Sequence, residues 1–189
     1  MRRIIILTFI LTLVIFSSCA SPRANQDVSL GELVKSVMHK LDIDPSDVGI
    51  LYHGDSEDED YIYDDILLKI MFPPTQSPGG DIVYNMDLFD GYAIVQYAKA
   101  KPVMFEIGIF KLDKPEDTRD IIYRNNLGKI EMMCRERVAR LKRTALEYSP
   151  ELAFASEKAN VYIFDNYIYY IIAENYRDAY AQVRAELTE

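Results

Sequence analysis

The sequence contains no tryptophan, two histidines and two cysteines, and its 21 basic residues are outnumbered by 30 acidic ones. The formal net charge of -9 argues against DNA or RNA as a partner, because a nucleic acid binds a basic surface. His39 and His53 form no metal-binding spacing with each other or with the cysteines, and the chain has no Gly-x-Ser-x-Gly motif. Eight glycines and eight prolines in 189 residues are too few for a collagen or a low-complexity chain. The composition is that of an ordinary globular protein.

One long hydrophobic run is present, and it lies at the start of the chain. Residues 1–3 carry two arginines, residues 4–16 are apolar except for Thr8 and Thr12, and small residues follow at 17–21. A basic start, a short apolar run and small residues are typical of a secretory signal peptide. The run of about 13 residues is shorter than the roughly 20 that a membrane-spanning helix needs.

The end of this run resembles the lipobox of bacterial lipoproteins, in which a Leu, a small residue and Gly, Ala or Ser precede a cysteine. Ser17, Ser18 and Cys19 fit that pattern, whereas Phe16 stands where the Leu is usual. The resemblance implies that residues 1–18 are removed and that diacylglycerol is attached to Cys19. The protein would then be extracytoplasmic and held at the cell membrane by its lipid. Acyl chains contribute about 0.8 kcal/mol per buried CH₂, so two or more give a stable anchor.

Loss of residues 1–18 would leave 19 basic and 30 acidic residues, a formal charge of -11. An anionic bilayer would repel such a chain, which favours a lipid anchor over a basic surface helix. With Cys19 acylated, Cys134 would have no partner for an internal disulfide, and we expect it to be a buried apolar residue.

The chain divides into four segments by composition. We predict a signal peptide at 1–18, a polar tether at 19–28, an N-terminal helical part with an acidic loop at 29–71, and an α+β domain at 81–189. Residues 72–80 are rich in proline and glycine and mark the last boundary.

Within the N-terminal part, apolar spacing predicts helices over 30–41 and 61–71. Ser29 and Glu32 have the spacing of a capping box for the first of them. The acidic residues at 55–60 lack the alternating ligands and the glycine of a calcium loop. We interpret them as a solvated loop, with weak divalent-cation binding as the alternative.

The C-terminal part combines strands and helices. We predict strands at 92–98 and 103–110, a long helix opening at 113–116 and ending before Pro150, a hairpin of 161–164 and 167–173 around Asp165 and Asn166, and a last helix at 175–187. The predicted fold is α+β, with a small antiparallel sheet, a long helix packed across it, and N-terminal helices.

Three short motifs in this part are similar to those of DUF4358, a family of clostridial-type lipoproteins known as a domain of unknown function. They are the strand Phe-Glu-Ile-Gly-Ile-Phe-Lys at 105–111, Tyr-Ser-Pro-Glu at 148–151, and the hairpin at 159–173. The likeness covers roughly 85–187. It implies a secreted, lipid-anchored module, and it brings no catalytic residues and no cofactor.

Two groups of side chains are candidates for an interaction surface. Arg137 and Arg140 belong to a basic cluster that we place on the solvated side of the long helix, opposite Cys134, with contact to wall polymer or lipid head groups as the alternative. The second group is tyrosine: Tyr169 and Tyr170 are adjacent, so we expect one of them to face outward. The predicted surface consists of Tyr167, Tyr169, Tyr170, Arg137 and Arg140.

These observations predict a lipid-anchored binding module of the cell envelope, with an envelope protein or a wall polymer as partner and no metal or cofactor. The alternative is a cell-wall enzyme, or an accessory of one, in which Glu106 and a second carboxylate act as acid and base. Glycosidase chemistry needs two carboxyl groups about 5–9.5 Å apart across a cleft. A pocket that pairs Glu106 with another acid would favour this alternative.

Overall fold

The computed structural model describes residues 23–53, 71–72, 75–77, 80–82, 89–97, 104–148 and 155–188. The predicted signal peptide, Cys19, the acidic loop at 55–60 and nearly all of the helix predicted at 61–71 lie outside the described residues.

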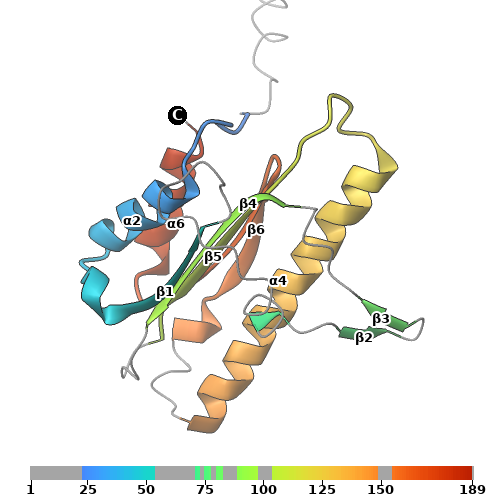
Figure 1. The fold of residues 1–189 in the computed structure, drawn as a ribbon. Coiled ribbons are helices and arrows are strands. Elements are labelled where there is room, and N and C mark those ends of the chain that lie inside the picture. Colours follow the sequence, from blue (N-terminus) through green and yellow to red (C-terminus); the bar gives the residue numbers. More distant parts are fainter. Residues whose placement is uncertain are drawn as a thin grey trace, which may run out of the picture.

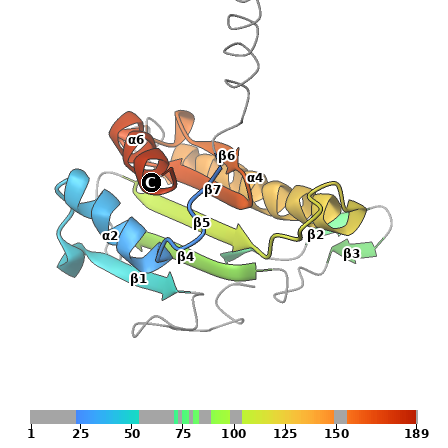
Figure 2. The same ribbon diagram turned by 90° about the horizontal axis from the view of Figure 1, so that it is seen from above.

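The described residues form a five-stranded antiparallel sheet (Figures 1 and 2). Its strands, in spatial order, are β1 (Val48–His53), β4 (Phe89–Tyr97), β5 (Glu106–Leu112), β7 (Tyr167–Ile172) and β6 (Asn160–Phe164). A separate small hairpin pairs β2 (Thr75–Ser77) with β3 (Gly80–Ile82). The antiparallel sheet and its long helix confirm the predicted α+β class.

Helices cover both faces of this sheet (Figure 1). α2 (Leu30–Lys40) and α6 (Tyr176–Glu186) pack on one face, and α4 (Ile121–Tyr148) packs across the other. The short 3₁₀ helix η1 (Pro45–Asp47) joins α2 to β1. Because successive side chains of a strand point to opposite faces, each central strand contributes to two cores. In β7, Tyr169 and Ile171 face α2 and α6, whereas Tyr170 and Ile172 face α4.

Several predicted elements are confirmed at their expected positions. The Oγ atom of Ser29 accepts a hydrogen bond from the Glu32 amide and caps α2. Phe164 pairs with Tyr167, so Asp165 and Asn166 form the two-residue turn of the hairpin. Asp165 has a φ of 57°, a left-handed conformation that Asp and Asn tolerate better than most residues. α6 lies where the last helix was predicted.

The predicted start of the long helix is wrong. Residues 113–120 form a loop, and α4 begins at Ile121. The cap is Asp120, whose Oδ1 atom accepts hydrogen bonds from the amides of Ile122 at 2.6 Å and Tyr123 at 3.0 Å. Asp113 and Pro115 resemble a helix start, but Asp120 satisfies the first free amides of the helix.

The N-terminal part shares its core with the rest of the molecule. Leu33, Val34 and Val37 of α2 are buried against Ile107 and Tyr169 of the sheet. β1, which apolar spacing did not predict, pairs along β4 and ends at His53. The Pro- and Gly-rich residues 72–80 therefore mark a change in sequence composition. They do not separate α2 and β1 from the core of the C-terminal part.

Candidate functional site

A buried ion pair joins the sheet to the long helix. Arg137 of α4 donates from Nε to Oε1 of Glu106 at 2.8 Å and from Nη2 to Oε2 at 2.6 Å. The side chain of Glu106 is 3% exposed and that of Arg137 is 11% exposed. A two-point guanidinium–carboxylate contact of this kind fixes both the distance and the orientation of the two groups.

Tyr170 completes this cluster from the neighbouring strand. Its hydroxyl donates to Oε1 of Glu106 at 2.6 Å. The ring of Tyr170 lies directly over Gly108, its partner in the β5–β7 register, where a Cβ atom would lie 2.4 Å from the ring. The glycine thus leaves the space through which the tyrosine hydroxyl passes to reach the carboxylate.

A third segment packs onto the cluster at Met71 and Phe72. Both residues are buried, and the Met71 carbonyl oxygen accepts hydrogen bonds from Arg137 and Arg140. The Phe72 ring meets the rings of Phe110 and Tyr170 edge to face, with centroids 5.5 and 6.3 Å away. These aromatic contacts and the carbonyl together attach the segment to α4 and the sheet.

Burial governs the ionisation of the groups around this pair. It raises the pKa of the Tyr170 phenol well above its ordinary value, and the neighbouring carboxylate of Glu106 raises it further. Burial likewise raises the pKa of the Cys134 thiol, with a smaller contribution from Glu131. Burial alone would lower the pKa of Arg137, but the hydrogen bonds and charge of Glu106 outweigh it and raise the pKa. The cluster therefore combines one ion pair, between Glu106 and Arg137, with the neutral phenol of Tyr170 and the neutral thiol of Cys134.

This arrangement does not suit acid–base chemistry. Both oxygens of Glu106 are held by Arg137 or Tyr170, and the residue is 2% exposed. A general acid or base must lie within hydrogen-bond reach of a substrate proton. The partner of Glu106 is a guanidinium and not the second carboxylate that a glycosidase site needs. The cluster is arranged to position α4 on the sheet.

The predicted interaction surface is not formed. Tyr167, Tyr169 and Tyr170 are all at most 1% exposed, so the expectation that one of them faces outward is wrong. The physical reason is the second helical layer: α2 and α6 cover one face of β7 and α4 covers the other. Tyr169 stacks on Tyr162 and lies near Tyr180, within the core beneath α6.

The arginines also depart from the prediction. Arg137 points into the sheet and Arg140 is half-buried against Met71, whereas Arg135 and Arg143 lie on the exposed side of α4 as expected. Arg137 follows Met133 by four residues and Cys134 by three, which places it on the buried stripe. An acidic residue inside an apolar strand, at Glu106, was the signal that such a partner was needed.

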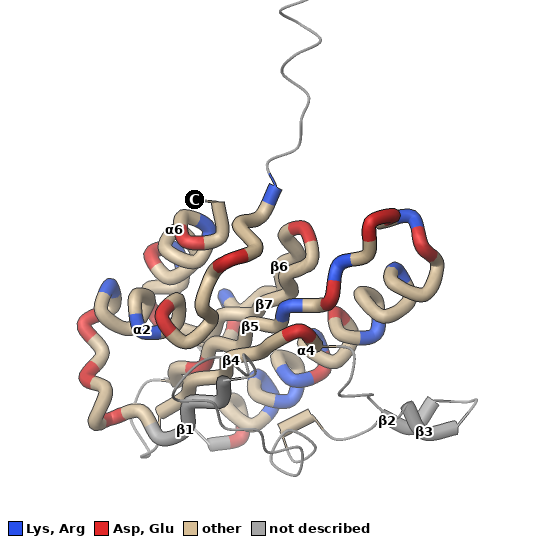
Figure 3. The backbone as a smooth tube through the Cα atoms, turned by 45° about the horizontal axis from the view of Figure 1, so that its top comes forward, with Lys and Arg blue, Asp and Glu red and all other residues tan. Residues whose placement is uncertain are grey.

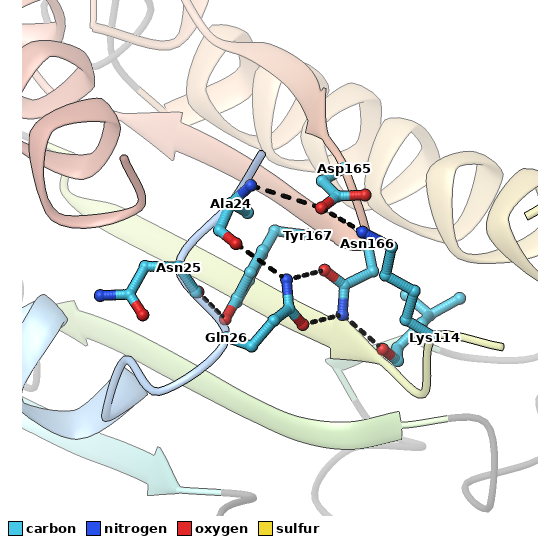
Figure 4. A network of polar contacts seen from close by, with 8 residues as sticks. Ala24, Asn25, Gln26, Lys114, Asp165, Asn166 and Tyr167 are labelled. Carbon is cyan, nitrogen blue, oxygen red and sulfur yellow. Dashed lines mark hydrogen bonds and ion pairs between the residues drawn. The ribbon is translucent and has the colours of Figure 1, made fainter. Parts of the chain in front are cut away.

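A second network attaches the chain near its N-terminus to the hairpin turn (Figure 4). The side chains of Gln26 and Asn166 exchange two hydrogen bonds, each 3.0 Å long. The Asn166 amide also donates to the carbonyl oxygen of Leu112 at 2.8 Å. Asn166 is 1% exposed, so these bonds satisfy an amide that would be costly to bury alone.

Main-chain atoms of the same segment are held as well. The amide of Ala24 donates to Oδ2 of Asp165 at 3.3 Å, and Lys114 pairs with the same oxygen at 2.5 Å. The main-chain carbonyl of Asn25 accepts a hydrogen bond from the Tyr167 hydroxyl at 2.8 Å. The main-chain amide of Asn25 donates to the Leu187 carbonyl at 2.9 Å. Residues 24–28, which the sequence places in a free tether, thus lie against the folded domain.

The remaining candidate residues are Cys134, which lies beside Tyr170 in the first cluster, and His39. Cys134 is buried with an unpaired thiol, and His39 is exposed on α2. Across the described ranges, no group of three or more His, Cys, Asp and Glu side chains is placed to hold a metal ion. Nor does any helix in that part of the chain combine the length and the apolar character needed to cross a membrane. Comparison of the chain with protein families, curated proteins and solved structures finds no match.

Proposed function

We propose that the protein is a bacterial lipoprotein, anchored to the outside of the cell membrane by lipid on Cys19, whose folded domain binds another envelope component. The observation that carries the proposal is the N-terminal sequence: a basic start, an apolar run at 4–16 and Ser17-Ser18-Cys19. The similarity to DUF4358 lipoproteins at 85–187 agrees with it.

The position of the folded domain supports this proposal. Among the described residues, Ala24, five residues after Cys19, is the first to hydrogen-bond to a distant part of the chain. An acylated cysteine would therefore be followed almost at once by a rigid domain, as expected of a protein that works close to the membrane.

The charged cluster favours a binding module over the cell-wall enzyme. Glu106, the acid on which the enzyme depends, is enclosed between Arg137 and Tyr170. Because both faces of the central strands are covered, we propose that partners bind the outer surfaces of the helices or the sheet edges.

Lipid attachment is tested by growing cells with an alkyne-bearing fatty acid and comparing Cys19→Ala with Cys134→Ala. The chain has only these two cysteines, so the second variant is a matched control. We expect wild type and Cys134→Ala to carry the label and to fractionate with membranes, and Cys19→Ala to lose both properties. An intact mass that begins at Met1 without an acyl adduct would contradict the proposal.

Partner binding is tested by crosslinking in intact cells, with Cys19→Ala as the comparison. A binding module should give discrete crosslinked products that are identified by mass spectrometry and that diminish when the anchor is lost. Hydrolysis of purified wall material by the wild-type protein, abolished in a folded Glu106→Gln variant, would favour the enzyme instead.

A further inference from the structure

The chain between Cys19 and the domain is very short. Ala24, the first of the described residues with a long-range hydrogen bond, is held by Asp165 of the hairpin turn. The five residue steps from Cys19 to Ala24 span at most about 18 Å when fully extended. The head-group layer of one leaflet takes up roughly 5–8 Å of that reach. A lipid on Cys19 would thus hold Ala24 within about a dozen ångströms of the membrane surface, with Asp165 in contact with Ala24.

Several segments lie at this same end of the domain. Lys114 of the loop preceding α4 pairs with Asp165. Burial raises the pKa of Tyr123 in the first turn of α4, and the nearby charge of Asp165 raises it further. Figure 1 shows the β6–β7 turn, the loop leading into α4 and the C-terminus together at the top of the view. We call this surface the anchor end, defined by residues 113–124, 165–166 and 187–188.

The anchor end carries two unusually exposed apolar side chains. Ile121 is 72% exposed and Ile122 is 67% exposed, the two highest values among the large hydrophobic residues of the described chain. Both occupy the first turn of α4, where Asp120 caps the helix and presents them at its tip. In water these two exposed isoleucines gain no free energy of burial, whereas apolar groups enter the head-group boundary of a bilayer favourably.

Little net charge opposes this contact. The anchor end contains three bases and five acids. The bases are Lys114, Arg119 and Arg124, and the acids are Asp113, Glu116, Asp117, Asp120 and Asp165. Figure 3 shows both signs mixed around the loop before α4. The large excess of acid in the chain therefore lies elsewhere, away from an anionic bilayer.

We infer that the anchor end faces the bilayer, with Ile121 and Ile122 inserted into the head-group boundary beside the lipid on Cys19. This rests on the lipid attachment proposed above, and it adds an orientation: α4 leads away from the membrane. Leu146, near the far end of α4 and 65% exposed, lies 24 residues and about 36 Å along the helix from Ile122.

The two exposed positions provide a matched experiment. Ile122→Cys and Leu146→Cys are made in the full chain, purified with their lipid and labelled with an environment-sensitive fluorophore. Cys19 is blocked by its own acylation, and Cys134 is fully buried, so each variant has one reactive thiol. Each protein is placed in phosphatidylglycerol–phosphatidylethanolamine vesicles with or without brominated acyl chains.

We expect brominated lipid to quench the probe at 122 by about a factor of two and to leave the probe at 146 unchanged, since bromine quenches only at the depth of an inserted group. The mass of Cys19 is measured on the same samples. Equal quenching at both positions, or none at either, on acylated protein would overturn the orientation alone. An unacylated Cys19 would refute the proposed lipoprotein and this inference together.

Discussion

The ring of Tyr170 occupies the space that a side chain on Gly108 would need. The two residues are paired across β5 and β7, and a Cβ atom on Gly108 would lie 2.4 Å from Cε1 and 2.6 Å from Cζ of the ring. The ring cannot move aside freely, because its hydroxyl is bonded to Glu106 and Phe72 packs against its edge.

We therefore expect Gly108→Ala to lower the free energy of unfolding by about 1–3 kcal/mol through overpacking. Gly128, on the exposed side of α4 with no neighbour within 4 Å, is the matched control. Gly128→Ala should raise the free energy of unfolding by about 0.5–1 kcal/mol, because alanine favours the helix. Urea unfolding of both variants checks the prediction. The prediction fails if the two substitutions change the free energy of unfolding in the same direction.

The Glu106–Arg137 pair should be costly to break from either side. Glu106→Gln or Arg137→Met leaves one buried charge without its partner, and we expect a loss of about 3–5 kcal/mol. The double substitution should lose less than the sum of the single ones. Glu131 and Arg135, an exposed pair one helical turn apart on α4, should show a coupling of at most about 0.5 kcal/mol. A double-mutant cycle on each pair measures the difference, and equal coupling energies would contradict the structural role of Glu106.

Stability should fall as the solution becomes alkaline. Burial raises the pKa of Cys134 and of Tyr170 in the folded protein, so the native state keeps two protons that the unfolded chain releases. Their contribution to stability is complete below the pKa values of the unfolded chain, about 8.5 for Cys and 10 for Tyr. It is lost as the pH rises above these values.

Each group adds a slope approaching about 1.4 kcal/mol per pH unit once its unfolded form is ionised. The free energy of unfolding, measured from denaturation curves between pH 8 and 11, should therefore fall less steeply with pH in Cys134→Ala and Tyr170→Phe than in wild type. Slopes equal to that of wild type would show that Cys134 and Tyr170 do not cause the loss of stability at alkaline pH.

The Asn166 side chain should stabilise the docked N-terminal segment. Asn166→Ala removes the donor to the Leu112 carbonyl and both bonds to Gln26, and we expect a loss of about 1–3 kcal/mol. Gln26→Ala leaves the Leu112 bond intact and removes an exposed side chain, so it should cost less. Hydrogen exchange at the Asn25 amide, which donates to Leu187, should quicken in both variants. Protection equal to wild type in Asn166→Ala would show that the segment is held by other contacts.

The local elements of this fold were readable from the sequence because their signals are local. Ser29 with Glu32 marks the start of α2, and Asp165 with Asn166 marks the hairpin turn. β1 was missed because its short run of apolar residues shows no alternation. The start of α4 was misplaced because residues 113–116 and Asp120 offer competing caps.

The buried cluster depends on a relationship between layers that local patterns do not carry. Tyr169 and Tyr170 were expected to face opposite environments, yet two helical layers make both environments apolar. The unbroken apolar run of β7 is the pattern of a strand that is buried on both faces. In a sheet that is covered on both faces, a charged residue such as Glu106 requires a partner in the core, and Arg137 is that partner.

The bonds from Asn25 to Leu187 and from Ala24 to Asp165 link the two ends of the domain. A chain that emerges from its N-terminus cannot form them until its last strands and α6 have also emerged. Ala24 and Asn25 therefore close onto the domain as one of the final steps of folding.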